Sequence, residues 1–149
     1  VFVNESPCLV AQLLNEGMIS LAQLHGNEDE SYLKQLRTLT DGGLIQAFTV
    51  RSEKDVKRAV QSTADYTLLD NGRGTGERFD WRLVRDISCP WILAGGLTPD
   101  NMMQAAEKLH PWALDLSSGV ETDGYKDREK ILEAVAAVRS VNRNITDTI

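Results

Sequence analysis

Short apolar runs alternate with amphipathic stretches along the whole chain. Six of these runs are rich in β-branched and aromatic residues, which predicts strands. They are Val1–Val3, Ile19–Leu24, Leu44–Val50, Tyr66–Leu69, Trp91–Ala94 and Trp112–Leu116. Their carboxyl ends, taken at Val3, Leu24, Ala47, Leu69, Ala94 and Leu116, recur every 21 to 25 residues, about the length of one strand, one helix and two short loops. The spacing therefore predicts a repeat of βα units.

The amphipathic stretches between the strands predict helices. Ser6-Pro7 and Thr98-Pro99 place proline at the first helical position after a hydroxyl cap, and Ser52-Glu53 begins an acidic first turn. The predicted helices cover about residues 7–16, 29–38, 52–61, 99–108 and 126–140. Continuously apolar strands indicate a parallel sheet covered by helices. This pattern fits both an open doubly wound sheet and part of a (β/α)8 barrel.

Length and charge narrow the classes of protein. The 149 residues, with average hydrophobic content, predict one globular domain over residues 1–149. The net charge is −6 and no cluster of Lys and Arg is present, so we expect no nucleic-acid partner. No apolar run reaches the roughly 18 residues that cross a bilayer, so we expect no membrane association.

The cysteines indicate a reducing compartment. Cys8 and Cys89 lie far apart, without the spacing of a zinc site or a disulfide framework. We therefore expect a cytoplasmic protein without a metal site. Cys8 lies at a predicted helix start, where the dipole can favour a thiolate, but an ordinary half-buried thiol is the preferred interpretation.

Polar or glycine-rich residues follow the predicted strands. In a parallel sheet these residues meet at one edge, where α/β proteins place their active sites. They are Asn4, His25-Gly26-Asn27, Asp70-Asn71-Gly72, Gly95-Gly96 and Ser117-Ser118-Gly119.

Two neighbouring loops predict a phosphate site. Gly95-Gly96 follows a strand and opens a helix, so its main-chain N–H groups can face an anion without an intervening side chain. Ser117 and Ser118 add hydroxyl donors one unit later. A lone Gly-Gly pair also fits a plain tight turn, but two such loops after the last two strands match the phosphate site of many (β/α)8 barrels.

Two aspartates are candidates for chemistry. Asp70 ends an apolar run, where partial desolvation can adjust a carboxyl group for proton transfer, although a turn aspartate before Asn71-Gly72 is the alternative. Asp115 lies inside an apolar run, so we expect it to be buried with a polar partner. His25 can contact a ligand or form a structural hydrogen bond. The glycine-rich stretch 71–78 is predicted to be a mobile loop over the ligand.

Five motifs in register resemble the phosphoribosylanthranilate isomerase family of tryptophan biosynthesis. The first two are Val1-Phe2-Val3-Asn4 and Gln23-Leu24-His25-Gly26-Asn27-Glu28; the third is Leu68-Leu69-Asp70 with Gly74-Thr75-Gly76-Glu77-Arg78-Phe79-Asp80-Trp81. The last two are Leu93-Ala94-Gly95-Gly96-Leu97-Thr98-Pro99-Asp100-Asn101 and Leu114-Asp115-Leu116-Ser117-Ser118-Gly119-Val120-Glu121. Together they extend over nearly the whole chain.

The resemblance implies a (β/α)8 (TIM) barrel and an isomerase. Members of the family convert N-(5′-phosphoribosyl)anthranilate into an aminodeoxyribulose phosphate by an Amadori rearrangement, without metal or organic cofactor. By resemblance, Asp70 is the general acid that protonates the furanose ring oxygen. Gly95, Gly96, Ser117 and Ser118 match the phosphate loops, and Asp115 and His25 match positions close to the substrate.

The chain also departs from the family pattern. The family's barrel begins with a Lys-Ile-Cys-Gly strand, whose cysteine is the general base, and a second unit that supplies an arginine for the anthranilate carboxylate. The chain matches from the third strand, so the resemblance implies an incomplete barrel of six parallel βα units, corresponding to strands 3–8. Cys8 does not align with the base cysteine, and Gln46 stands where many relatives carry a basic residue.

Two open sheet edges are expected in a barrel of six units. Unpaired strand edges invite pairing, so we expect self-association or docking of a segment that supplies the first two units. We also expect little activity from the chain alone, because the general base is not among its motifs. Two alternatives stay open: a non-catalytic phosphate-binding protein, and a structural subunit of a larger assembly.

Overall fold

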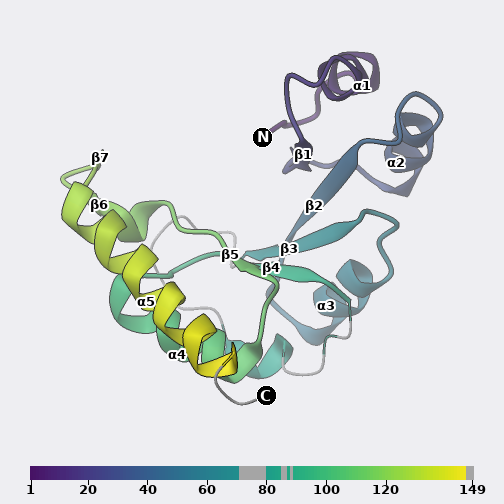
Figure 1. Cartoon of the computed structure of the whole chain (residues 1–149). Coiled ribbons are helices and arrows are strands. Elements are labelled where there is room, and N and C mark those ends of the chain that lie inside the picture. Colours follow the sequence, from purple (N-terminus) through teal and green to yellow (C-terminus); the bar gives the residue numbers. More distant parts are fainter. Residues whose placement is uncertain (71–79, 85–86, 88, 147–149) are drawn as a thin grey trace.

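Five parallel strands in the order β1-β2-β3-β4-β5 form the sheet of the computed structural model (Figure 1). The structure describes residues 1–149 except 71–79, 85–86, 88 and 147–149, and side chains up to residue 140. The sheet strands are β1 (Leu21–Leu24), β2 (Gly43–Thr49), β3 (Tyr66–Asp70), β4 (Trp91–Leu93) and β5 (Ala113–Leu114). A separate hairpin pairs β6 (Glu121–Thr122) with β7 (Tyr125–Lys126).

The helices follow the predicted βα order. They are α1 (Pro7–Asn15), α2 (Glu30–Arg37), α3 (Glu53–Val60), α4 (Pro99–Leu109) and α5 (Arg128–Thr146), with short 3-10 turns η1 (Trp81–Val84) and η2 (Ser118–Val120). Capping boxes at Ser52 and Thr98 confirm two of the predicted helix starts. Among the described helices, none has the length and apolar character needed to span a bilayer.

The first predicted strand is present only as an isolated bridge. Phe2 pairs in parallel with Leu24, and the N–H of Phe2 donates to the carbonyl of Gln23. Asn4 then takes a left-handed backbone conformation, with φ of 54°, which turns the chain out of the strand direction. The described residues therefore hold a sheet of five strands, in place of the six that the sequence predicts.

The register separates the sheet into two faces. Leu44, Phe48 and Leu69 lie on the face that packs against the helices. Ile45 and Leu68 lie on the opposite face. Both faces of the strands are apolar, which explains the continuous apolar runs in the sequence.

Two hydrophobic clusters on the helix-covered face meet along β2. Leu44 belongs to the cluster that includes residues of α1 and α2. Phe48, four residues later, packs against the cluster that includes residues of α3 and α4. Buried Gln46 lies between them in sequence and faces the helices, donating from Nε2 to the carbonyl of Glu28 at 2.7 Å. β2 thus joins the two parts of the core.

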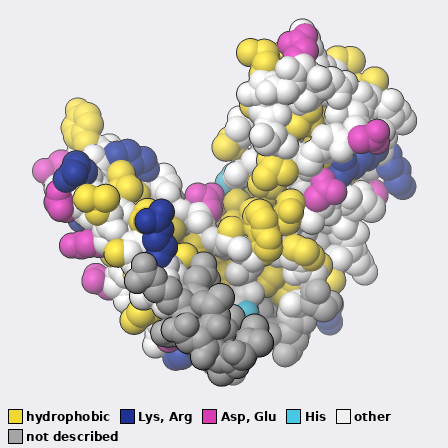
Figure 2. Space-filling model, viewed as in Figure 1, with side chains coloured by type: hydrophobic (Ala, Val, Ile, Leu, Met, Phe, Trp, Pro, Cys, Tyr) yellow, Lys and Arg dark blue, Asp and Glu magenta, His cyan; other side chains and the backbone are white. Residues whose placement is uncertain are grey.

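Apolar side chains are visible in the hollow between the part of the molecule with α1 and α2 and the part with the β6–β7 hairpin (Figure 2). The alternation along β1 places Leu21 on the face opposite the helices, and this side chain is 40% exposed. Phe2 packs on the helix side, and its neighbours Val1 and Val3 are both exposed. Exposed apolar side chains therefore lie beside β1, the edge strand nearest the start of the chain.

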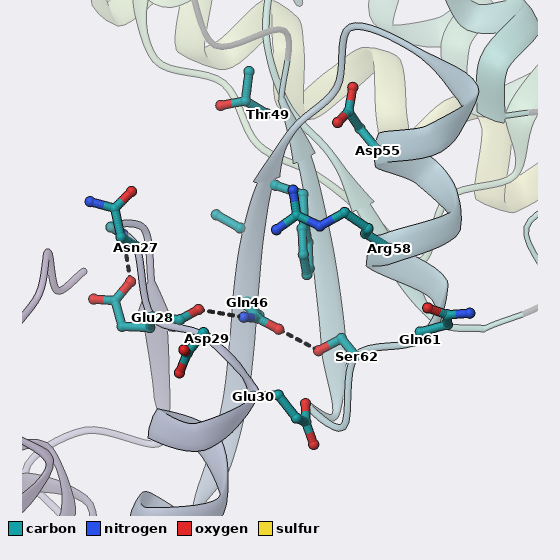
Figure 3. A pocket seen from close by; sticks show the side chains of 13 residues that line it. Asn27, Glu28, Asp29, Glu30, Gln46, Thr49, Asp55, Arg58, Gln61 and Ser62 are labelled. Carbon is teal, nitrogen blue, oxygen red and sulfur yellow. Dashed lines mark hydrogen bonds between the residues drawn. The ribbon is translucent and has the colours of Figure 1, made fainter.

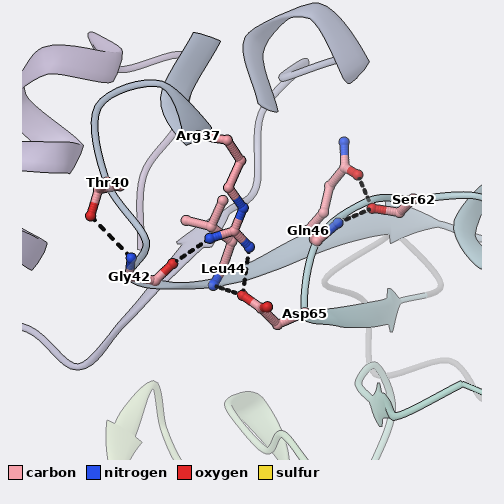
Figure 4. A network of polar contacts seen from close by, with 8 residues as sticks. Arg37, Thr40, Gly42, Leu44, Gln46, Ser62 and Asp65 are labelled. Carbon is pink, nitrogen blue, oxygen red and sulfur yellow. Dashed lines mark hydrogen bonds and ion pairs between the residues drawn. The ribbon is translucent and has the colours of Figure 1, made fainter. Parts of the chain in front are cut away.

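A polar brace links α2 with the starts of β2 and β3 (Figure 4). The Arg37 guanidinium donates to the Gly42 carbonyl and to Asp65 Oδ2, both at 2.7 Å. The same Asp65 oxygen accepts the N–H of Leu44 at 2.7 Å. Desolvation alone raises the pKa of Asp65, but these hydrogen bonds and the Arg37 charge outweigh it, so the pKa is lowered.

We predict that Asp65→Asn lowers the free energy of unfolding at pH 7 by about 1 to 2 kcal/mol, because it removes the charge that strengthens the hydrogen bonds from Arg37 and Leu44. The loss is modest because solvent screens this 46%-exposed carboxylate. The lowered pKa means that the carboxylate stabilises the fold above its ordinary pKa of 3.8, and that this is lost as pH falls through the lowered value. Urea unfolding at pH 7 and pH 3 measures both effects, with exposed Asp41→Asn as control. If the unaltered chain and Asp65→Asn differ in free energy of unfolding as much at pH 3 as at pH 7, the electrostatic explanation is contradicted.

Candidate active site

The carboxyl ends of the strands meet along one edge of the sheet. Thr49 pairs with Asp70, the last residue of β3. The N–H of Ala94 donates to the carbonyl of Leu69, and the N–H of Asp115 donates to that of Leu93. The predicted polar residues therefore follow neighbouring strands at the same edge, as the parallel pattern requires.

Asp70 and His25 lie next to each other at this edge. His25 Nε2 is 3.9 Å from Asp70 Oδ2, and the side chains are 38% and 22% exposed respectively. Asp70 is thus partly removed from water and still reachable by a ligand. A carboxyl group in this position can give a proton to a bound molecule.

Gln23 orients the His25 ring. Its amide nitrogen, Nε2, lies 2.9 Å from His25 Nδ1. The tautomer that fits donation from this amide NH2 group accepts at Nδ1 and carries its proton on Nε2, the nitrogen that faces Asp70. Gln23 lies inside the matched motif, but the sequence offered no sign of this role.

A second carboxylate, Glu28, holds the loop that carries His25. Its two oxygens accept the N–H groups of Asn4 at 2.6 Å and Gly26 at 2.7 Å. The side-chain oxygen of Asn4 accepts the N–H of Asn27 at 2.7 Å. A Cβ on Gly26 would lie 2.6 Å from that same oxygen, so only glycine fits there. Sequence reasoning missed Glu28, because its partners come from the amino-terminal segment.

The two predicted phosphate loops lie against each other. Gly95 and Gly96 both have left-handed φ values, of 84° and 65°. A Cβ on Gly119 would overlap the carbonyl oxygen of Leu97, which shows how closely the loop after β5 approaches the loop after β4. These backbone conformations favour glycine and leave main-chain groups accessible to an anion.

Buried Asn101 fixes the first of these loops. Its Oδ1 accepts the N–H of Thr98 at 3.0 Å, and its Nδ2 donates to the carbonyl of Gly96 at 2.9 Å. In the second loop, Ser117 and Ser118 are exposed, as a ligand-binding role requires. Lys126 also reaches this loop, donating to the Ser117 carbonyl at 3.0 Å.

Asp115 corrects one prediction. It is exposed, whereas its position in an apolar run predicted burial with a polar partner. β5 ends at Leu114 and forms the edge of the sheet, so no further strand covers this side chain among the described residues. Asp115 still follows β5 at the same sheet edge as Asp70.

The sequence analysis also considered a mobile loop, the two cysteines and a metal site. The predicted mobile loop 71–78 falls outside the described residues. Cys8 is exposed on α1, and Cys89 is half-buried; both are free thiols. In the described part of the chain, no cluster of three or more His, Cys, Asp or Glu residues is arranged to hold a metal ion.

A polar cavity of about 620 Å³ lies between the β1–α2 loop, β2 and α3, and reaches the strand-end residues Gly26, Asn27 and Thr49 (Figure 3). Gln46 lines it and accepts the Ser62 hydroxyl at 2.6 Å. None of the seven predicted site residues lines this cavity. The candidate site is therefore the open sheet edge, and this cavity is a gap between α2 and α3.

Known proteins match almost the entire chain. The model of the N-(5'phosphoribosyl)anthranilate (PRA) isomerase family matches residues 1–137. The N-(5'-phosphoribosyl)anthranilate isomerase of Endomicrobium trichonymphae is 41% identical over 146 residues, which cover 95% of this chain and 72% of the relative. That of Clostridium acetobutylicum is 39% identical over 148 residues, covering 93% and 71%.

Solved structures agree with this match. The crystal structure of phosphoribosyl anthranilate isomerase from Thermotoga maritima superposes with a TM-score of 0.80 at 32% identity, covering 93% of this chain and 71% of that one. A phosphoribosyl anthranilate isomerase in complex with reduced 1-(o-carboxyphenylamino)-1-deoxyribulose 5-phosphate gives a TM-score of 0.77 at 31% identity, covering 93% and 69%.

We predict that Glu28→Gln destabilises the chain by about 1 to 3 kcal/mol, because an amide leaves one of the two main-chain N–H groups without an acceptor. Amide hydrogen exchange at Asn4 and Gly26 should be faster in the variant than in the unaltered chain, whereas exchange in the core of β3 should change less. Chemical unfolding and exchange measured by NMR provide the readouts. Glu107→Gln, at an exposed position, is the control. Equal exchange rates at Asn4 and Gly26 in the two variants would refute the role of Glu28 in holding this loop.

Proposed function

Because the chain belongs to the N-(5'-phosphoribosyl)anthranilate isomerase family, an enzyme family of tryptophan biosynthesis, we propose that it carries out the family's reaction. That reaction is the Amadori rearrangement of N-(5′-phosphoribosyl)anthranilate to 1-(2-carboxyphenylamino)-1-deoxyribulose 5-phosphate. The match over residues 1–137 is the observation that carries the proposal. The meeting of the motif residues at one sheet edge supports it.

Asp70 is the general acid in this proposal. Its carboxyl group donates a proton to the furanose ring oxygen, the ring C–O bond breaks, and a Schiff base forms between the sugar and the anthranilate nitrogen. A base then removes the proton next to the former anomeric carbon, giving the enol-amine that becomes the ketose. The part-buried position at the end of β3, with His25 3.9 Å away, supports this role.

The phosphate group of the substrate binds at the loops after β4 and β5. Gly95 and Gly96 offer main-chain N–H groups, and Ser117 and Ser118 offer hydroxyls. The close approach of Gly119 to Leu97 supports a shared site for one phosphate. His25 and exposed Asp115 contact the sugar or the anthranilate from either side of Asp70.

In this proposal the Phe2 segment with α1, and the strands β1 to β5 with the elements that follow them, correspond to units three to eight of the family barrel. Six of eight units make about three quarters of such a barrel, and the chain covers 72% and 71% of the two curated relatives. The general-base cysteine and the arginine for the anthranilate carboxylate belong to units one and two. Cys8 does not replace that base, because it lies on α1, after the first segment.

We predict that the chain gains isomerase activity when a separate (βα)2 fragment supplies units one and two. Loss of substrate fluorescence follows turnover, and Asp70→Asn should lower kcat by roughly 10²- to 10⁴-fold, as expected for one general acid. Phosphate-ligand binding with no turnover under complementation would instead favour a non-catalytic binding protein. Activity that is unchanged in Asp70→Asn would refute the assigned acid.

The proposal extends to partners, compartment and domain organisation. The exposed apolar face beside β1 and the edge strand β5 favour association with another chain or with the complementing units. The free thiols Cys8 and Cys89 fit a reducing cytoplasm. The shared strand β2 between two core clusters fits one domain over residues 1–149.

We predict that the chain alone self-associates at micromolar concentration, as measured by light scattering after size exclusion. Val3→Lys should weaken association, because it adds a charge among the exposed apolar side chains beside β1. Val60→Lys is the control, since Val60 is similarly apolar and 41% exposed but lies at the end of α3. A monodisperse monomer of the unaltered chain would overturn this prediction.

A further inference from the structure

Lys126 contacts the candidate phosphate loop, although no motif of the sequence pointed to it. Its Nζ donates to the Ser117 carbonyl at 3.0 Å, to Ser117 Oγ at 3.3 Å and to Glu121 Oε1 at 2.7 Å. Lys126 lies on β7 and pairs with Glu121 across the hairpin. The ammonium group is therefore held beside Ser117 from a separate element of the fold.

The direction of these hydrogen bonds determines what Ser117 can offer a ligand. A lysine ammonium has three donors and no acceptor, so Ser117 Oγ accepts from it. The hydroxyl proton of Ser117 is then directed away from Lys126 and is available to a phosphate oxygen. The ammonium group, although it is also paired with Glu121, polarises this hydroxyl and adds attraction for a dianionic phosphate.

We propose that Lys126 is a positioning residue of the phosphate site, which orients the Ser117 hydroxyl as a donor and supplies the cation that the glycine loops lack. The inference rests on the proposed function, because it takes the loops after β4 and β5 as the phosphate site. It adds a residue from the β6–β7 hairpin to that site.

The hairpin is anchored well enough to hold the ammonium group in place. The N–H of Asp127 donates to the Val120 carbonyl at 2.8 Å, and the Thr122 hydroxyl donates to Asp127 Oδ2 at 2.6 Å. Lys130 Nζ donates to the main-chain carbonyl of Glu121 at 2.6 Å. Buried Val120 packs with Met102 of α4 and Ala134 of α5. These contacts fix the backbone of Lys126, so the position of its ammonium group is set by the hairpin as well as by the side chain.

The experiment compares binding of ribose 5-phosphate and ribose to the unaltered chain and to three variants, followed by NMR shifts of the backbone amides. Lys126→Met keeps the length of the side chain and removes its charge. Lys126→Arg keeps the charge. Arg128→Met is the matched control, because it removes a positive charge two residues away, from an 81%-exposed side chain that in the described part of the chain forms hydrogen bonds with neither Ser117 nor the residues that anchor the hairpin.

We expect Lys126→Met to weaken ribose 5-phosphate binding about threefold to tenfold, as for one partly exposed charge. Its affinity should also depend less on added salt than that of the unaltered chain, because one screened interaction is gone. Lys126→Arg and Arg128→Met should keep most of the affinity. Ribose should bind equally weakly to all four proteins. Thermal melting of each protein verifies that the fold is retained.

Equal ribose 5-phosphate affinity and salt dependence in Lys126→Met and the unaltered chain would overturn the role of Lys126 and leave the phosphate site intact. An equal loss in Arg128→Met would overturn it in favour of a general effect of surface charge, and a full loss in Lys126→Arg would overturn it in favour of a structural effect of the hairpin. Absence of binding by the unaltered chain would overturn the phosphate site itself and this inference with it.

Discussion

The parallel pairing of β2 with β1 and β3 is the interaction on which the rest of the structure depends. β2 is the longest strand of the sheet, and its two ends pack in different hydrophobic clusters through Leu44 and Phe48. Its parallel register also sets which residues lie at the carboxyl edge, because Thr49 pairs with Asp70. The core and the candidate active site are therefore consequences of the same ladder of hydrogen bonds.

Contacts between successive units hold the loops at that edge. Glu28 binds the segment before α1 to the loop after β1, and Gly119 packs against Leu97 of the preceding loop. A carboxylate that accepts two main-chain N–H groups satisfies both donors and gives such a loop a defined conformation. Proton transfer at Asp70 and anion binding at the glycine loops both require this order, since each depends on groups held within hydrogen-bond reach of a ligand.

Prediction from the sequence succeeded where local rules apply. The helix starts at Ser52 and Thr98 follow from capping chemistry, and Gly95-Gly96 lies between a strand and a helix as predicted. It failed where the outcome depends on distant partners. Asp115 was expected to be buried because its neighbours in sequence are apolar, yet it is exposed because its strand lies at the edge of the sheet. Val1–Val3 has the composition of a strand, but Asn4 ends its pairing after one bridge.

The sequence by itself determined the βα repeat, the parallel sheet and the strand-end positions of Asp70, Gly95, Gly96 and Ser117, because periodicity, caps and glycines act within a few residues. Only the tertiary structure decided how these residues meet. Glu28 bonds to a residue 24 positions away, and Lys126 to one 9 positions away. Such contacts depend on how strands, loops and hairpins pack in space, and no local preference of either residue encodes them.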